Sequence, residues 1–129
     1  MISVEDVLFQ HRKVIAATGG ADGIRDIDVL DSAINRPFQT FDGDNLYPTL
    51  IEKTAALIES IIVNHPFVDG NKRTGYTVLR TFLLVNEIDL IADENSKYNF
   101  VISIASGEIH FEEIVTWLLN NTTSIKKIK

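Results

Sequence analysis

Residues 65–75, HPFVDGNKRTG, gather the side chains that acid–base and phosphate chemistry needs. The D-G-N sequence at 69–71 is typical of a turn that leads into a helix, which places Lys72 and Arg73 in the first helical turn. That end of a helix carries partial positive charge and free N–H groups, so cations are unfavourable there unless an anion binds beside them. Polyphosphate is the natural candidate, because arginine binds it in a forked geometry and lysine binds it as a point charge.

Two further side chains in the segment complete a possible active site. Asp69 could hold Mg²⁺, which accompanies triphosphates and takes one or two carboxylates. His65 can accept a proton near neutral pH, as a general base acting on an attacking hydroxyl must. The same residues also allow an arrangement without a ligand. In that arrangement His65 caps the preceding helix, Asp69 pairs with Lys72 or Arg73, and the cations point to solvent. The spacing alone leaves both open.

These residues need a frame, and apolar residues recur at helical spacing along most of the chain. Ser3 with Asp6 predicts a capped helix start, and the glycine pair at 19–20 predicts its end. Pro66 ends the helix before the segment, because the residue before a proline is pushed out of the helical region. Residues 38–47 predict a flap that could be a short β-hairpin. We predict an all-α bundle of about six helices, near residues 3–19, 26–37, 50–64, 71–83, 95–105 and around 114–118.

Composition places the chain among single globular domains. It has 129 residues, 45% of them apolar and 23% charged, so we expect one domain over 1–129 with a frayed tail at 122–129. The net charge of −6 argues against direct binding to nucleic acid, and acid gathers at residues 22–31. No apolar run approaches the length of about 20 residues that crosses a bilayer. The start of the chain does not resemble a signal peptide. We therefore expect a cytoplasmic protein that does not enter membranes.

Two apparent motifs fail on inspection. D-x-D-N at 42–45 is similar to the start of a calcium loop, but the twelfth position of that frame is Lys53 instead of glutamate. G-N-K-R-T-G-Y-T has the two glycines of a P-loop, but Tyr76 stands where that motif needs lysine. His11 falls on the apolar stripe of the first helix, where a packed histidine with one hydrogen bond is expected.

HPFVDGNKR resembles the signature of the Fic/Doc family, H-P-F-x-[D/E]-G-N-G/K-R. GIRD at 23–26, followed by LDSAINRP at 30–37, is similar to the death-on-curing (Doc) branch of that family. The resemblance covers residues 2–119. It implies the compact helical Fic/Doc fold, in which the flap at 38–47 docks a target protein as an extended strand.

The resemblance assigns a role to each residue of the motif. His65 matches the catalytic base, Asp69 the metal-linked acidic position, and Arg73 the phosphate-binding arginine. Gly70 and Asn71 match the anion-binding turn, and Lys72 adds a catalytic charge to the phosphate site. We count Thr74 with the same phosphate-binding set. Pro66 and Phe67 match the buried anchor of the loop.

Lys72 bears on the group that is transferred. Most AMP-transferring members of the family have glycine at this position, whereas Doc-type toxins have lysine. The resemblance implies that these toxins bind Mg²⁺-ATP in the reverse sense and transfer the γ-phosphate to a threonine of elongation factor Tu, which stops translation. Gly70 differs from Doc-type motifs that carry alanine there, so the motif is a hybrid. The expected function is a protein kinase-like toxin; the alternatives are an AMP transferase acting on a serine, threonine or tyrosine hydroxyl, and a non-catalytic binding module.

Control is expected to come from a second protein. Many Fic proteins carry an inhibitory [S/T]-x-x-x-E-[G/N] helix, but no serine or threonine in this chain has glutamate four residues later. The resemblance therefore implies a separate antitoxin, whose disordered tail folds on binding. The acidic segment at 22–31 is a candidate docking surface for it.

Overall fold

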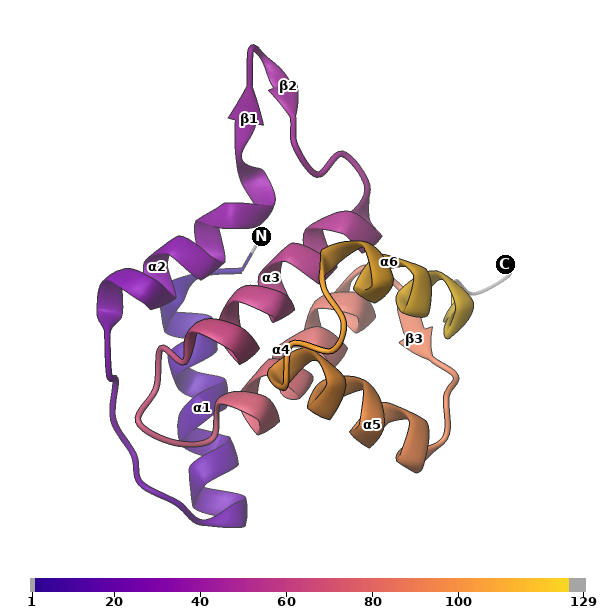
Figure 1. Ribbon diagram of the computed structural model, residues 1–129. Helices are drawn as coiled ribbons and strands as arrows, with labels where there is room; N and C mark the ends of the chain where they lie inside the picture. The colour runs from indigo at the N-terminus through magenta and orange to yellow at the C-terminus, as the bar shows by residue number, and fades with distance from the viewer. Residues whose placement is uncertain (1, 126–129) are drawn as a thin grey trace.

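The computed structural model describes residues 2–125 (Figure 1). The prediction of an all-α bundle with a hairpin flap is confirmed, and the expected helix boundaries hold to within a few residues. The six helices of the described chain are α1 (Val4–Thr18), α2 (Ile27–Asn35), α3 (Leu50–Asn64), α4 (Asn71–Val85), α5 (Glu94–Ala105) and α6 (Phe111–Asn120).

Local capping explains where these helices begin. Ser3 and Asp6 form the predicted capping box at the start of α1. Asp26 accepts from two backbone N–H groups at the start of α2, and Thr49 with Glu52 forms a second box before α3. Each of these caps satisfies N–H groups that have no partner inside the helix. The loop at 65–70 therefore follows a helix whose first turn is fixed by its cap.

Helix α3 lies at the centre of the molecule, with α1 and α2 on one side and α5 and α6 on the other (Figure 1). Its residues face two apolar clusters, one shared with α4, α5 and α6 and one shared with α1, α2 and α4. Gly75 lets α4 approach α3 closely, because a Cβ at that position would lie 2.5 Å from Cγ1 of Ile62. Since α4 begins in the 65–75 segment, this close packing fixes that segment against the core.

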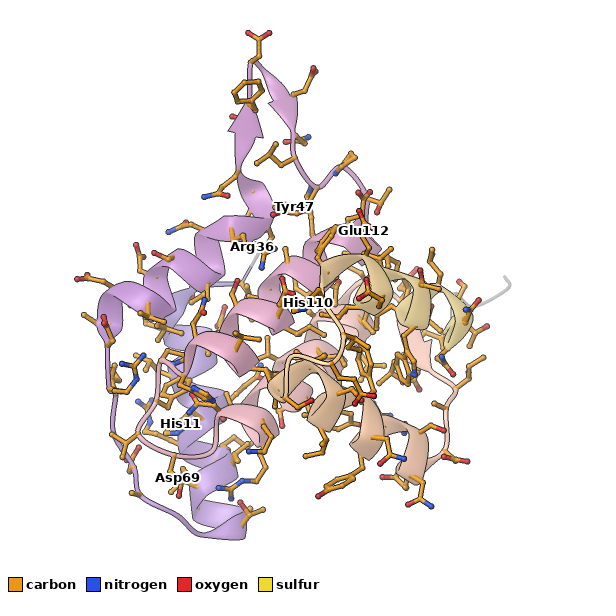
Figure 2. The ribbon with its side chains drawn as sticks, in the orientation of Figure 1. His11, Arg36, Tyr47, Asp69, His110 and Glu112 are labelled. Atoms are coloured by element: carbon orange, nitrogen blue, oxygen red, sulfur yellow. The ribbon has the colours of Figure 1, made fainter. Side chains whose placement is uncertain are left out.

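The flap is a short β-hairpin, with two residues in each strand, that projects from the body of the protein (Figure 1). Strand β1 (Thr40–Phe41) pairs antiparallel with β2 (Asp44–Asn45). Its base is held by Arg36, which donates to the hydroxyl of Tyr47 at 3.1 Å and to Glu59 at 2.9 Å. Arg36 and Tyr47 are labelled side by side in Figure 2. The tip is exposed, with Phe41 75% accessible, while its base is fixed to α3.

A second two-stranded sheet, formed by strands far apart in the chain, corrects the expectation of a frayed tail. Strand β4 (Thr122–Ser124) pairs antiparallel with β3 (Ile88–Leu90), so the tail is ordered at 122–124. The pairing continues on either side, because Ile91 donates to the carbonyl of Asn121 and Ile125 donates to that of Glu87. Backbone bonds to a distant strand outweigh the weak local preference of the tail. Residues 126–129 lie outside the described residues. No helix between residues 2 and 125 is long and apolar enough to span a bilayer.

Candidate active site

The loop between α3 and α4 is held at its start by residues 23–26. His65 ends α3 in the left-handed conformation, with φ 51° and ψ 65°, and its side chain is exposed. The carbonyl of Pro66 accepts from the backbone N–H groups of Arg25 and Asp26, at 2.8 and 3.1 Å. The guanidinium of Arg25 also donates to the carbonyls of Asn64 and His65. The expected end of α3 at this loop is confirmed, and Arg25 is a positioning residue that the sequence reading did not identify.

Phe67 anchors the middle of the loop, as expected. Its side chain is 1% exposed and its ring stacks on that of His11, with 3.8 Å between the centroids. His11 Nε2 donates to the carbonyl of Asp69 at 2.8 Å, which confirms the expected packed histidine with one hydrogen bond. His11 Nδ1 lies 3.6 Å from a carboxylate oxygen of Asp22. Helix α1 thus supports the carbonyl of Asp69 through His11, and the two residues lie close together in Figure 2.

The side chain of Asn71 closes the loop on itself. Its Oδ1 accepts from the N–H of Phe67 and its Nδ2 donates to the carbonyl of the same residue, both at 3.0 Å. The side chain is therefore occupied inside the protein, and what Asn71 offers to a ligand is its backbone N–H. Gly70 precedes it with φ 78°, a left-handed conformation that suits glycine.

The start of α4 presents unpaired donors and cations on the surface. The N–H groups of Asn71, Lys72 and Arg73 have no acceptor among residues 2–125, as expected for the first turn of a helix. Lys72 is exposed and forms no ion pair with any residue in that range. Thr74, expected to contact phosphate, is instead fully buried. Helical periodicity turns it toward the core, so the structure does not bring its side chain to the site.

Asp69 and Arg73 are connected, but both remain open to a ligand. Arg73 Nη1 donates to the hydroxyl of Thr18 and to the carbonyl of Gly19, and Nη2 lies 3.6 Å from Asp69 Oδ1. The side chains of Arg73 and Asp69 are 39% and 49% exposed. In the arrangement expected without a ligand, Asp69 pairs with Lys72 or Arg73; the structure shows the pair with Arg73 and not with Lys72. The sequence analysis interpreted Gly19 only as part of a helix end and did not consider Thr18.

Backbone donors keep Asp69 ionised. The N–H of Gly70 donates to its carboxylate at 2.8 Å and the N–H of Ala21 donates at 3.3 Å. These two hydrogen bonds lower the pKa of Asp69 below its ordinary value; desolvation opposes them, and the charges of Arg73 and His11 lower the pKa further by smaller amounts. Gly20 allows this geometry, because a Cβ there would lie 2.6 Å from Asp69 Oδ2.

The donor set at the loop fits Mg²⁺ carried by a nucleotide better than a metal held by protein alone. Within residues 2–125 no group of three or more acidic, histidine or cysteine side chains converges on one point. Asp69 supplies one ionised carboxylate at the exposed edge of the loop. Magnesium commonly binds through one or two carboxylates, with waters and phosphate oxygens completing its shell.

Comparison with known proteins agrees with this geometry. The family model described as Fic/DOC family matches residues 1–83, which include the whole loop and most of α4. A curated relative, Toxin Doc of Mycolicibacterium smegmatis (strain ATCC 700084 / mc(2)155), is 47% identical over 77 residues. That match covers 60% of this chain and 59% of the relative. Because the family model spans more than half of the residues, the chain belongs to the Fic/DOC family.

Proposed function

We propose that this protein is a Doc-like toxin that transfers the γ-phosphate of ATP to a hydroxyl of a target protein. The observation that carries the proposal is the start of α4, where three backbone N–H groups have no acceptor among residues 2–125 and the exposed Lys72 lies next to Arg73. Such a site favours a multiply charged anion. The name of the Mycolicibacterium smegmatis relative supports a toxin.

The proposed reaction assigns one task to each side chain. The target's hydroxyl oxygen bonds to the γ-phosphorus while the bond from that phosphorus to the β–γ bridging oxygen breaks, and ADP leaves. His65, exposed at the end of α3, accepts the hydroxyl proton. Lys72, Arg73 and the N–H groups of α4 stabilise the charge on the transferring phosphoryl group. Asp69 would hold Mg²⁺, which when bound neutralises phosphate charge.

The target and the controlling partner follow from the same proposal. Elongation factor Tu is the expected target, and the flap is expected to dock it as an extended strand. The exposed Phe41 and Leu46 give that flap an apolar surface to which an extended segment can bind. A cognate antitoxin with a disordered tail is the expected inhibitor. AMP transfer is the competing reaction, since Gly70 is also found in Fic motifs.

The test uses ATP labelled at the α- or the γ-phosphate, with Mg²⁺, purified elongation factor Tu and the purified protein. His65→Asn is the inactive variant of choice, because asparagine tolerates the left-handed conformation of residue 65. His110→Asn, at the start of α6, is the matched control. We expect label only from the γ-phosphate, lost in His65→Asn and retained in His110→Asn.

Other outcomes decide among the alternatives. Label from the α-phosphate would establish AMP transfer. No label from either position, in both elongation factor Tu and a whole lysate, would reject catalysis with ATP and favour the binding module. Label that persists in His65→Asn would remove His65 from the role of base.

A further inference from the structure

Helix α3 ends without the backbone hydrogen bonds that usually close a helix. His65 adopts φ 51° and ψ 65°, a left-handed conformation that glycine commonly occupies at a helix end. In the common cap, the residue after the left-handed one donates its N–H to a carbonyl of the last turn. That residue here is Pro66, which has no N–H. The N–H of His65 has no backbone acceptor among residues 2–125 either. The last carbonyls of α3 therefore need another donor.

The guanidinium of Arg25 is that donor. Its Nη2 donates to the carbonyl of Asn64 at 2.7 Å, and its Nε donates to the carbonyl of His65. A guanidinium holds its donors in a rigid planar fork, so it can serve two adjacent carbonyls at once, whereas a lysine ammonium is a point charge. A cation is also favourable at the C-terminal end of a helix. Arg25 thus caps α3 in place of the missing backbone bonds.

The backbone around Arg25 is anchored without help from this side chain. The carbonyl of Pro66 accepts from the N–H groups of residues 25 and 26, and the N–H of Val68 donates to the carbonyl of Gly23 at 3.1 Å. These bonds tie residues 23–26 to the catalytic loop. Removal of the guanidinium should therefore leave the loop in place and release only the end of α3.

We propose that Arg25 acts on the reaction through His65: by capping α3, it holds the backbone of the base in the left-handed conformation. The inference rests on the proposed function and names the residue that fixes its base. A left-handed backbone is unfavourable for a residue with a side chain. Without the cap, residue 65 should move toward the helical or extended region and carry its imidazole with it. A displacement of about 1 Å in an active site can cost about a hundredfold in rate.

The cap should affect the chemical step and not the binding of ATP. The proposed phosphate site lies at the start of α4, where the cations are Lys72 and Arg73. Within residues 2–125, the donors of Arg25 reach only the carbonyls of residues 64–66. A variant without the guanidinium should therefore keep its KM for Mg²⁺-ATP and lose kcat.

The first measurement is steady-state transfer of the γ-phosphate to elongation factor Tu. Arg25→Ala should lower kcat about 10- to 100-fold and leave the KM for Mg²⁺-ATP unchanged. Arg25→Lys should restore only part of kcat, because one ammonium group does not reproduce the fork. Guanidinium chloride below denaturing concentrations, with sodium chloride as its control, should raise kcat in Arg25→Ala. Arg12→Ala is the matched control and should change neither constant, because Arg12 is exposed on α1 and makes no hydrogen bond or ion pair with residues 2–125.

The second measurement does not depend on catalysis. The Cα and Cβ chemical shifts of His65, recorded by NMR on the isotopically labelled protein, report its backbone conformation. They should indicate the left-handed region in the unmodified protein and in Arg12→Ala. In Arg25→Ala they should move toward helical or extended values.

The possible results separate this inference from the proposed function. Unchanged kcat with unchanged His65 shifts in Arg25→Ala would overturn the inference and leave γ-phosphate transfer standing. A raised KM with unchanged kcat would also overturn it, because Arg25 would then contact a substrate. Moved His65 shifts in a protein that transfers no phosphate would support the cap and reject the kinase. If the fluorescence of Trp117 shows that Arg25→Ala does not fold, the same two measurements on Arg25→Lys decide.

Discussion

Replacing Asn71 by alanine should destabilise the protein through the loop and not through the ligand. The Asn71 side chain is 9% exposed and bonds both the N–H and the carbonyl of Phe67. Alanine removes both partners at once and leaves two backbone groups unsatisfied beside a ring that is 1% exposed. Each unsatisfied buried group costs about 1–3 kcal/mol, so for the two groups we expect a loss of about 2–6 kcal/mol in the free energy of unfolding.

The measurement is urea unfolding followed by the fluorescence of Trp117. This single tryptophan stacks on Phe100 at 3.8 Å and therefore reports on the core. Asn86→Ala is the matched control at the other end of α4, because its exposed side chain makes one hydrogen bond, to the carbonyl of Phe82. It should cost about 1 kcal/mol or less.

A specific pattern would refute this account of Asn71. If Asn71→Ala unfolded at the same urea concentration as the unmodified protein but bound ATP much more weakly, the side chain would be a ligand contact. Equal losses in Asn71→Ala and Asn86→Ala would show that the bonds to Phe67 contribute no more than one surface bond.

Two further predictions concern packing and pH. Gly75→Ala should lower the free energy of unfolding by about 1–2 kcal/mol. The new Cβ would lie 2.5 Å from Ile62 Cγ1, and the cost of moving α4 away from α3 exceeds the gain in helix propensity from glycine to alanine. In urea unfolding the double variant with Ile62→Ala should lose less than the sum of the single losses. For Asp69, the fold lowers the pKa, so its stabilising effect is complete above the ordinary aspartate pKa and is lost as pH falls through the lowered value. Thermal unfolding of Asp69→Asn should therefore show a shallower loss of stability on acidification, with a remainder from Asp6 and Asp93, whose pKa values are also lowered.

The parts of the fold that depend on nearby residues could be predicted from the sequence. The capping box of Ser3 and Asp6 spans four residues, and the apolar stripe of α3 lies within one continuous stretch of sequence. The pairing of β3 with β4 could not be predicted from the sequence, because more than thirty residues separate paired residues such as Ile88 and Ser124. Neither segment has a strong strand pattern.

The same distinction applies to the site. The cluster of His65, Asp69, Lys72 and Arg73 was visible because its members are close in sequence. The contacts of Arg73 with Thr18 and Gly19 join residues more than fifty positions apart, so no local pattern reveals them. The burial of Thr74 was available to sequence reasoning, because Thr74 lies four residues before the buried Val78 on one face of α4.

The left-handed backbone of residue 65 favours glycine for stability, whereas the proposed reaction needs histidine at the same position. An L-residue with a side chain costs about 1–2 kcal/mol in that conformation, whereas glycine adopts it freely and is the usual choice just after a helix. A screen that selects variants for heat resistance alone should therefore favour His65→Gly and discard the proposed base. The residue proposed as the base occupies a position where glycine would end the helix at lower cost, so an engineer seeking a more stable version of this protein should keep residue 65 unchanged.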